Sequence, residues 1–313
     1  MTDIWPERWR HCGSDSALGE PMRCLSTIFV CFAVIAFPIN ATAVGVNSSP
    51  VVDGLSHVPV AVRDLASAEK DFQRLGFTLK PGRIHSDGIQ NAHVKFEDGT
   101  EIELITAYKG IDSLTKSYLD HLKNGEGPAF VALYAPNVSA LESRLKASSL
   151  PYEAEDGLIS FPAGSTTSEI FFAGLNHSPT DKPAYFEHAN GADGVIAVWL
   201  AGTDLAEETA LLSKLGAKER QEPFVLTPNE NVRAMNMELG DILLLPPKFV
   251  VVQKHPVVGV TVRTHDLSKV LTVFRETGMK APKIVNFKGG RSLLVPPEMA
   301  HGMWIEFRES TLR

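Results

Sequence analysis

Cysteine is absent from this sequence after residue 31, because its three cysteines are Cys12, Cys24 and Cys31. A mature protein that begins near residue 44, as argued below, would contain none of them. Such a protein has no disulfide, no thiolate metal site and no cysteine nucleophile. Any catalysis or metal binding would then depend on histidines, carboxylates and amides.

Several sequence motifs are also missing. The 313 residues carry a net charge of −7 and show no basic stripe, so a nucleic-acid partner is not expected. No phosphate-binding loop, dinucleotide fingerprint or HExxH motif occurs, and Gly164-Ser165 lacks the flanking glycine of GxSxG. We therefore expect a small-molecule ligand, and the sequence leaves the oligomeric state open.

The N-terminal part differs from the rest. Met22-Arg23 is followed by an apolar run that ends at Ala41-Thr42-Ala43, a small-x-small pattern typical of signal-peptide cleavage. We expect residues 22–43 to be a signal peptide, residues 1–21 to be an upstream extension, and the protein to be periplasmic or secreted. A membrane anchor is the alternative. Pro38 interrupts the run, which is short for a span, so no stable membrane insertion is expected after cleavage.

One helical pattern occurs four times. Each copy opens with an N-capping residue, continues with apolar residues on one face, and reaches a small residue twelve positions later. The caps and stops pair as Asp64 with Gly76, Asn137 with Ser149, Asp204 with Gly216, and Asp266 with Gly278. A fourfold agreement in cap, length and stop indicates an internal repeat.

The segments around each helix complete the repeating unit. A short apolar strand precedes each helix, as in HVPVAVR and VVGVTVR, and three strand-like segments follow it. The sequence therefore predicts an α+β fold of four βαβββ modules. A lone module would expose one face of its sheet, so modules should pair into two curved sheets, each around a cleft. We expect one domain over residues 44–180 and a second over residues 181–313.

These motifs resemble the vicinal oxygen chelate superfamily, and most closely its glyoxalase-like proteins. The resemblance covers about residues 54–308. It rests on GLSHVPVAVRDLASAEKDFQRLGF in the first module, GEGPAFVAL before the second, YFEHANGADGV before the third, and PPEMAHGMWIEF at the end. It implies two barrels of paired modules and an activity that the fold alone does not specify.

The resemblance also implies a divalent metal, such as zinc, nickel, manganese or iron. In this superfamily the ligands lie on the first and last strands of each module, and the metal binds adjacent oxygens of the substrate. His57 and Glu103 stand at these two positions in the first module. Glu101 and Glu103 share one face of their strand, where a carboxylate is costly to bury unless it is paired or bound.

The other modules depart from the ligand pattern. Phe130 and Phe171 replace His57 and Glu103 in the second module, and Leu243 and Val257 occupy ligand positions in the third and fourth. Only the fourth keeps its acid, Glu306. If modules pair in chain order, His57 and Glu103 need help from His93 on a neighbouring strand. If the first pairs with the fourth, Glu306 completes the set. We rank chain-order pairing first.

Two hypotheses about function follow. The first is a metal-dependent lyase, isomerase or dioxygenase that acts on a small oxygen-chelating molecule, with Glu103 or Glu306 as the catalytic acid or base. The second is a metal-free protein that sequesters a small molecule on a degenerate scaffold. In both, the expected ligand contacts are Asn91, Phe130, Phe171 and Trp199. The three aromatic rings suit an apolar molecule.

Overall fold

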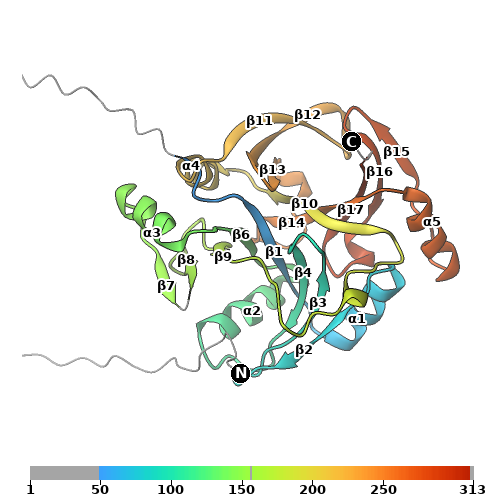
Figure 1. The fold of residues 1–313 in the computed structure, drawn as a ribbon, viewed down its shortest axis with the longest axis horizontal. Helices are drawn as coiled ribbons and strands as arrows, with labels where there is room; N and C mark the ends of the chain where they lie inside the picture. Colours follow the sequence, from blue (N-terminus) through green and yellow to red (C-terminus); the bar gives the residue numbers. More distant parts are fainter. Residues whose placement is uncertain (1–48, 156, 311–313) are drawn as a thin grey trace, which may run out of the picture. The chain divides into compact units, whose positions relative to one another are not determined.

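The computed structural model describes residues 49–155 and 157–310, which form one compact unit. The predicted signal peptide and all three cysteines lie outside the described residues. The predicted α+β fold of four βαβββ modules is confirmed, with two curled sheets flanked by helices (Figure 1). Among the described residues, no helix is both long enough and apolar enough to cross a membrane.

The four repeated helices lie where the sequence predicts, although the third of them begins one residue later than expected and has Leu205 at its N-cap in place of Asp204. Their bounds are α1 (Leu65–Arg74), α3 (Val138–Ala147), α4 (Ala206–Lys214) and α5 (Leu267–Glu276). The side chains of Asp64, Asn137 and Asp266 each accept a hydrogen bond from a backbone N–H in the first turn. All four stop residues have positive φ, and Ser149 adopts this conformation at φ 53° without being glycine.

The first two modules form one sheet, called sheet A. Its strands run in the order β2-β3-β4-β1-β6-β9-β8-β7, with β5 paired to β1. The two modules meet where β1 pairs antiparallel with β6. The bounds are β1 (Gly54–Ala61), β2 (Lys80–Ile84), β3 (Gln90–Lys95), β4 (Glu101–Thr106), β5 (Gly127–Pro128), β6 (Val131–Tyr134), β7 (Glu153–Glu155), β8 (Leu158–Ser160) and β9 (Ile170–Ala173).

The last two modules form the second sheet, sheet B, in the order β11-β12-β13-β10-β14-β17-β16-β15. Modules therefore pair in chain order, and the alternative pairing of the first module with the fourth is not the observed one. The bounds are β10 (Ala192–Ala201), β11 (Lys218–Phe224), β12 (Thr227–Met237), β13 (Gly240–Leu245), β14 (Val257–Thr264), β15 (Ile284–Phe287), β16 (Gly290–Val295) and β17 (Trp304–Glu309). The described part of the chain also contains the short 3₁₀ helices η1 (Pro183–Tyr185), η2 (Pro247–Phe249) and η3 (Pro297–Met299).

A shared apolar core joins the two sheets. Side chains from α1 and α5 belong to the same buried cluster, and Phe77 stacks on Phe307 with ring centroids 5.6 Å apart. At the first residue of β1, Gly54 forms a parallel bridge with Leu239, which lies between β12 and β13. The backbone of Leu239 exchanges hydrogen bonds with the residues on either side of Gly54. The sheets are therefore held together through backbone pairing as well as apolar packing.

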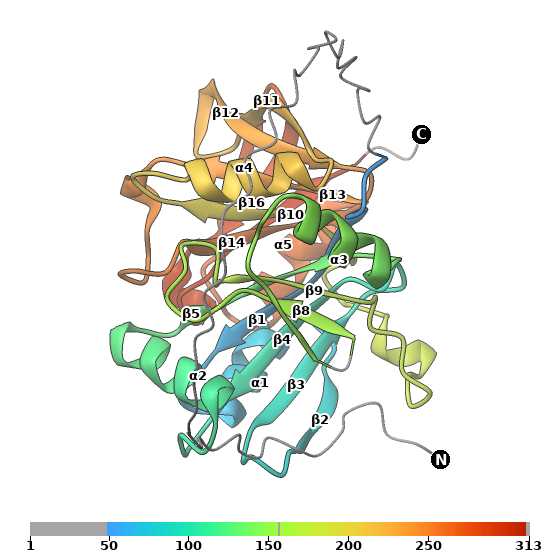
Figure 2. The same cartoon turned by 90° about the vertical axis from the view of Figure 1, so that its left-hand side faces the viewer.

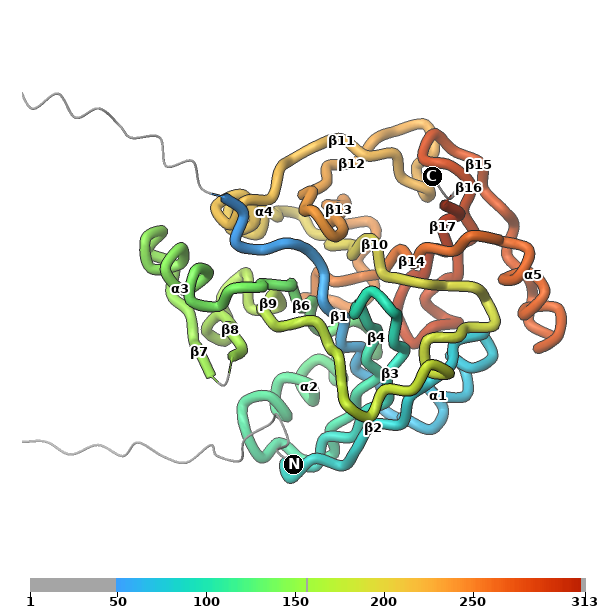
Figure 3. The backbone as a smooth tube through the Cα atoms, viewed as in Figure 1, coloured from blue at the N-terminus to red at the C-terminus, as the bar shows by residue number. Residues whose placement is uncertain are grey.

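The chain passes from sheet A to sheet B through the segment 174–191, called the linker. It runs past β2 and β3 before it reaches β10 (Figure 3). His188 anchors it: Nδ1 accepts a hydrogen bond from the backbone N–H of Thr78, and Nε2 lies 3.0 Å from the carbonyl oxygen of Lys95. Burial lowers the pKa of His188 to about 4, so the ring is neutral. The predicted domain boundary at residues 180/181 falls inside this linker and stays a prediction.

The helix between the first two modules was not predicted. It is α2 (Ser113–Asn124), and it begins with a capping box in which Asp112 and Thr115 exchange hydrogen bonds. Figure 2 shows it alongside β1 and β4. Its buried side chains pack with residues at the ends of β1 and β4, including Ala61 and Ile105. This helix therefore covers one end of sheet A.

Candidate functional site on the inner face of the first sheet

The two faces of sheet A have different chemistry. Val58, Val60, Ile102 and Leu104 point into the core beneath α1 and α3. Because side chains alternate along a strand, the residues between them lie on the opposite face, called the inner face of sheet A. The inner face presents His57, Asn91, His93, Lys95, Glu101, Glu103, Ala132 and Phe171.

Strand register sets these side chains in two cross-strand rows. In the first row Glu101 stands between Lys95 on β3 and His57 on β1. In the second row Glu103 lies directly opposite His93. Residues opposite each other in paired strands are near enough to interact. The structure thus brings together three of the four residues predicted as metal ligands, His57, His93 and Glu103, and places the predicted contacts Asn91 and Phe171 on the same face.

A serine fixes the orientation of His57. The Ser56 hydroxyl donates its only hydrogen to the carbonyl oxygen of Gly174 at 2.8 Å. His57 Nδ1 lies 3.0 Å from the same hydroxyl oxygen, which has no second hydrogen to give. His57 Nδ1 must therefore carry a proton and donate it. In the neutral ring this leaves a lone pair on Nε2, which makes no hydrogen bond to the described residues and is available to a ligand.

Glu101 and His93 form a buried ion pair. Glu101 is 1% exposed, and its two oxygens lie 2.5 Å from His93 Nδ1 and 2.6 Å from Asn176 Nδ2. Burial by itself would raise the pKa of Glu101, but the hydrogen bond and charge of His93 hold it below its ordinary value. Burial would lower the pKa of His93, but Glu101 raises it overall. The pair thus favours a charged imidazolium beside a carboxylate.

The linker supplies the carboxylate nearest to Lys95, whose ammonium also lies 3.9 Å from Glu101. Lys95 is 1% exposed, and its ammonium donates to the carbonyl oxygen of Asn176 at 2.6 Å and to the Asp181 carboxylate at 2.7 Å. Lys80 donates to the other oxygen of Asp181 at 2.5 Å. Burial works to raise the pKa of Asp181, but Lys80 and Lys95 outweigh it and lower that pKa to about 2. The linker therefore neutralises two cations beside the inner face.

Glu103 keeps one oxygen free. Its Oε1 accepts a hydrogen bond from Asn91 Nδ2 at 2.7 Å, and Asn91 in turn accepts from the backbone N–H of Arg83. Its Oε2 has no hydrogen-bond partner among the described residues. His85 lies nearby with Nε2 buried and unpartnered, and burial, followed by the charge of Arg83, lowers the pKa of His85. Glu103 can thus accept a hydrogen bond from a bound molecule.

The second module contributes an aromatic wall. Phe171 meets the His57 ring edge to face at 5.3 Å, and Phe130 lies 6.3 Å from Phe171. Tyr118 of α2 packs against Phe130 at 5.4 Å. Burial, followed by the charges of Glu103 and Asp87, raises the pKa of Tyr118, so its hydroxyl keeps its proton. The inner face of sheet A is therefore polar on one side and aromatic on the other.

The inner face of sheet B is filled by its own side chains. Trp199 is fully buried with Phe224 and Leu243, and its ring N–H donates to the Thr261 hydroxyl. Glu306, also fully buried, accepts hydrogen bonds from Thr261, Ser292 and both arms of the Arg308 guanidinium at 2.5–2.9 Å. Two other predicted site residues, Trp199 and Glu306, therefore lie in sheet B, apart from His57 and Glu103, with their polar atoms already paired.

These residues do not fit a divalent metal site. Among the described histidines, aspartates and glutamates, no three converge on a position that a metal ion could occupy. His57 and Glu103 keep one free atom each, but Phe130 and Phe171 stand where the second module would supply the remaining ligands. His93, predicted as a third ligand, is bound through Nδ1 to Glu101. No step of a mechanism is therefore drawn through a metal.

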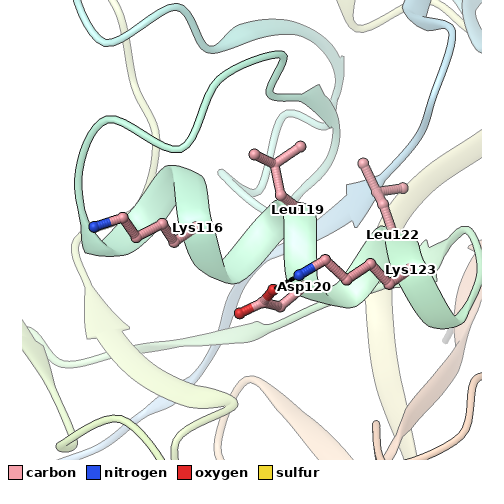
Figure 4. Close-up of a pocket in the computed structure, with 5 residues that line it drawn as sticks. All are labelled: Lys116, Leu119, Asp120, Leu122 and Lys123. Atoms are coloured by element: carbon pink, nitrogen blue, oxygen red, sulfur yellow. Dashed lines mark hydrogen bonds and ion pairs between the residues drawn. The ribbon is translucent and has the colours of Figure 1, made fainter.

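A depression in the surface of α2 is not the site. It is lined by Lys116, Leu119, Asp120, Leu122 and Lys123, which all come from one helix (Figure 4). Lys123 is paired with Asp120 at 2.5 Å, and both side chains are largely exposed. Nothing from a second element lines it, whereas side chains from five strands, β1, β3, β4, β6 and β9, share the inner face of sheet A, and the linker adjoins it.

One comparison with known proteins shows a family. Residues 55–216, slightly more than half of the chain, match the model of a family described as glyoxalase-like domain. No curated protein matches the sequence.

Solved structures share the fold at low identity. A hypothetical protein from Staphylococcus aureus matches with a TM-score of 0.55 and 11% identity, over 82% of this chain and 99% of that one. A variant of homoprotocatechuate 2,3-dioxygenase from B. fuscum gives 0.58 and 11%, over 85% and 74%. A mutant of 4-hydroxymandelate synthase from Streptomyces coelicolor gives 0.56 and 11%, over 85% and 94%. At such identities the likeness concerns the fold alone.

Proposed function

Because this chain belongs to the glyoxalase-like domain family, we propose that it is an enzyme of the lyase or isomerase kind that moves a proton on a small molecule. The proposed substrate carries adjacent oxygen atoms and an apolar or aromatic group. The proposed site is the inner face of sheet A. One observation carries the proposal: Ser56 and Gly174 hold His57 with its Nε2 lone pair free, at the border between the polar and aromatic walls.

In this proposal three polar side chains each have a separate role in the reaction. His57 Nε2 acts as the base that removes a proton from a carbon next to a carbonyl group. The electron pair moves to the carbonyl oxygen, and the free ring N–H of charged His93 donates a hydrogen bond to the negative charge that develops there. Glu103 Oε2 accepts a hydrogen bond from the adjacent hydroxyl. Return of the proton from His57 to the same carbon restores the enzyme. For isomerisation the proton returns to the neighbouring carbon, while Glu103 Oε2 takes the proton of the hydroxyl group and passes it to the former carbonyl oxygen.

The aromatic wall defines the rest of the substrate. Phe130 and Phe171 stand opposite the polar groups and offer edge and face contacts to an apolar or aromatic substituent. Lys80, Lys95 and Asp181 already neutralise one another. A substrate with a large net charge would therefore find no unpaired partner among them, and we expect a molecule of low charge.

Metal-free sequestration is the second candidate, and the same two phenylalanines favour it. A binding protein needs the apolar wall but not a base in one tautomer. The resemblance implies a divalent metal, whereas the enzyme proposed above uses none, and metal content of the purified protein decides between the two. Near-stoichiometric metal that both His57→Ala and Glu103→Ala abolish would establish metal dependence at this face.

The test separates binding from turnover. Residues 44–313, purified without a histidine tag, are screened by thermal shift against α-hydroxycarbonyl compounds and 1,2-dihydroxyarenes. Molecules that bind are then incubated in D₂O, and exchange of their carbon-bound protons is followed by NMR. We expect the unaltered protein to catalyse exchange and His57→Gln to bind without exchange.

The control is His265→Gln, which alters an exposed histidine of the second half and should exchange normally. Binding without exchange in the unaltered protein would favour sequestration. Exchange that persists in His57→Gln would refute the assigned base.

We also propose that the chain is exported after cleavage near residue 43, on the basis of the small-x-small pattern alone. Mass spectrometry of the N-terminus of the protein recovered from cells tests this. A chain that retains residues 22–43 would contradict it.

A further inference from the structure

Exposed apolar side chains gather at one end of sheet A. Within residues 49–155 and 157–310, five large apolar side chains are clearly exposed, and only Leu239 belongs to the second half. The other four are Ile84 (74% exposed), Tyr108 (59%), Ile111 (60%) and Leu114 (42%). Single exposed apolar residues are ordinary, but several in one place mark a surface that meets something other than water.

The chain brings these four residues together by two routes. Tyr108, Ile111 and Leu114 follow one another at intervals of three in the segment that leads from β4 into α2. Ile84 is the last residue of β2, and cross-strand register through Gln90 places it level with the end of β4. Because neighbouring strands lie about 5 Å apart, Ile84 stands at the same end of the sheet as the start of this segment.

The segment folds back against α2. A Cβ atom placed on Gly110 would lie 2.9 Å from Cγ of Lys116 and 3.5 Å from a methyl group of Leu119. The capping box between Asp112 and Thr115 fixes the turn that joins segment and helix. Lys116 and Leu119 also line the depression on α2 (Figure 4). The segment and the first two turns of α2 therefore form one continuous surface.

Three cations accompany the apolar residues. Arg83, Lys109 and Lys116 are exposed and form no ion pair with any described residue. The acids nearby, Asp87 and Asp112, are partly buried and accept backbone hydrogen bonds. The whole chain has a net charge of −7, so this unpaired positive charge is a local feature. The basic apolar patch is defined by the four apolar residues and the three cations: Ile84, Tyr108, Ile111, Leu114, Arg83, Lys109 and Lys116.

We propose that the basic apolar patch docks onto the surface of an anionic lipid bilayer. In such a bilayer the phosphates lie directly above the acyl chains, so its partner needs cations and apolar groups within a side chain's length of each other. The patch has this arrangement, since Lys109 lies between Tyr108 and Ile111 in the sequence. Farther along α2, Lys123 and Asp120 neutralise each other and add no net charge.

Each type of side chain has its place in this docking. Ile84, Ile111 and Leu114 enter the boundary between headgroups and acyl chains, and the Tyr108 ring lies at headgroup level. The cations lie beside the lipid phosphates, and salt weakens their attraction. The docking is peripheral and requires no membrane span. It is also independent of the function proposed for the inner face.

The test is flotation of residues 44–313 with two kinds of vesicle, phosphatidylcholine alone and phosphatidylcholine mixed with phosphatidylglycerol. This chain is used because residues 49–310 form one compact unit and because the apolar run within residues 22–43 is itself able to bind lipid. We expect flotation with the mixed vesicles and little with phosphatidylcholine alone. Raising the salt from about 0.05 M to about 0.5 M should weaken binding about tenfold.

Two double variants separate the two contributions. Lys109→Gln with Lys116→Gln should weaken binding to the mixed vesicles about tenfold or more, because both cations are lost. Glutamine keeps the Cγ atom of residue 116 against which Gly110 packs. Ile111→Ser with Leu114→Ser should weaken binding by a similar factor, because the apolar contact is lost. All four positions are exposed, so the unfolding midpoints should not change.

Matched controls come from the second half. Lys218→Gln with Lys288→Gln makes the same change in net charge at exposed positions, and Leu239→Ser removes the fifth exposed apolar side chain. Both should bind the mixed vesicles as the unaltered protein does. His57→Gln should also bind them normally, so failure of this proposal is distinct from failure of the function proposed for the inner face.

Three results would overturn the proposal. The first is absence of flotation with the mixed vesicles at low salt. The second is flotation that both patch variants retain, or that the lysine control loses to the same extent. The third is self-association in sedimentation velocity, without vesicle binding, that Ile111→Ser with Leu114→Ser abolishes. That result would assign the patch to a second copy of this chain.

Discussion

Replacement of Ser56 by alanine should release His57 from its single tautomer. The Ser56 side chain is 1% exposed, donates to Gly174 at 2.8 Å and accepts from His57 Nδ1 at 3.0 Å. A neutral hydrogen bond contributes about 1 kcal/mol, so loss of the bond to His57 should shift its tautomer ratio about fivefold toward the Nε2–H form. Loss of both bonds should lower the free energy of unfolding by about 1–2 kcal/mol.

The tautomer can be read directly from ring nitrogens. Long-range ¹H–¹⁵N spectra of protein labelled at its ten histidines distinguish a protonated nitrogen from one with a lone pair. His57→Gln assigns the His57 signals by their disappearance. We expect a lone-pair signal for His57 Nε2 in the unaltered protein, and mixed character at both nitrogens in Ser56→Ala.

The control for this variant is Ser67→Ala, which changes an exposed serine in the first turn of α1. It should leave the His57 spectrum unchanged. The reasoning would be refuted if His57 carried its proton on Nε2 in the unaltered protein, or if Ser56→Ala left both ring signals in place. Proton exchange on a bound substrate should fall in Ser56→Ala by about the fraction of His57 that loses the Nε2 lone pair.

Three further predictions concern stability. The hydrogen bond to Glu126 raises the pKa of His301, so its contribution to stability is present below the ordinary histidine value near 6.5 and is lost as pH rises through the folded value. Melting temperatures from pH 6 to 9 should therefore fall in the unaltered protein more than in His301→Gln. Glu306→Gln leaves the Arg308 guanidinium without its buried anion, so urea unfolding should show a loss of about 3 kcal/mol or more, and an unchanged midpoint would contradict that ion pair. Gly54→Ala places a Cβ atom 2.2 Å from the carbonyl oxygen of Leu239, in the turn between β12 and β13, and should cost about 1–3 kcal/mol by the same assay; an unchanged midpoint would show that the bridge can move apart.

Local pattern was sufficient to predict the modules. Each helix carries its own cap and stop within about a dozen residues, and these signals act at short range. Asp204 is the partial exception, because α4 begins at Ala206 and Asp204 accepts only from that residue's backbone N–H. The helix α2 has an equally local signal, the Asp112–Thr115 capping box, but lies outside the repeat and was missed.

The composition of the site could be predicted only in part. Repeat alignment identified His57 and Glu103 in the first module and Phe130 and Phe171 at the matching positions of the second, because equivalent positions of a repeat occupy equivalent places. It could not identify the residues that orient them. Ser56 acts through Gly174, which is 118 positions away, and Lys95 acts through the linker. Such partners depend on where a connecting segment lies in space, which periodicity does not encode.

The linker also determines how this protein can be divided. Asp181 accepts hydrogen bonds from two lysines of the first half, and one of them, Lys95, is buried. A shortened chain that stopped at residue 180 would contain every strand of sheet A but would remove the carboxylate nearest to Lys95. The buried cation would keep only Glu101, which is 3.9 Å away and already paired with His93, so the loss should be costly. A separable first half must therefore extend beyond Asp181. A chimera of this half with a different second half should fold only if the junction keeps that carboxylate. The segment needed to build the site is therefore longer than sheet A itself, which ends at Ala173.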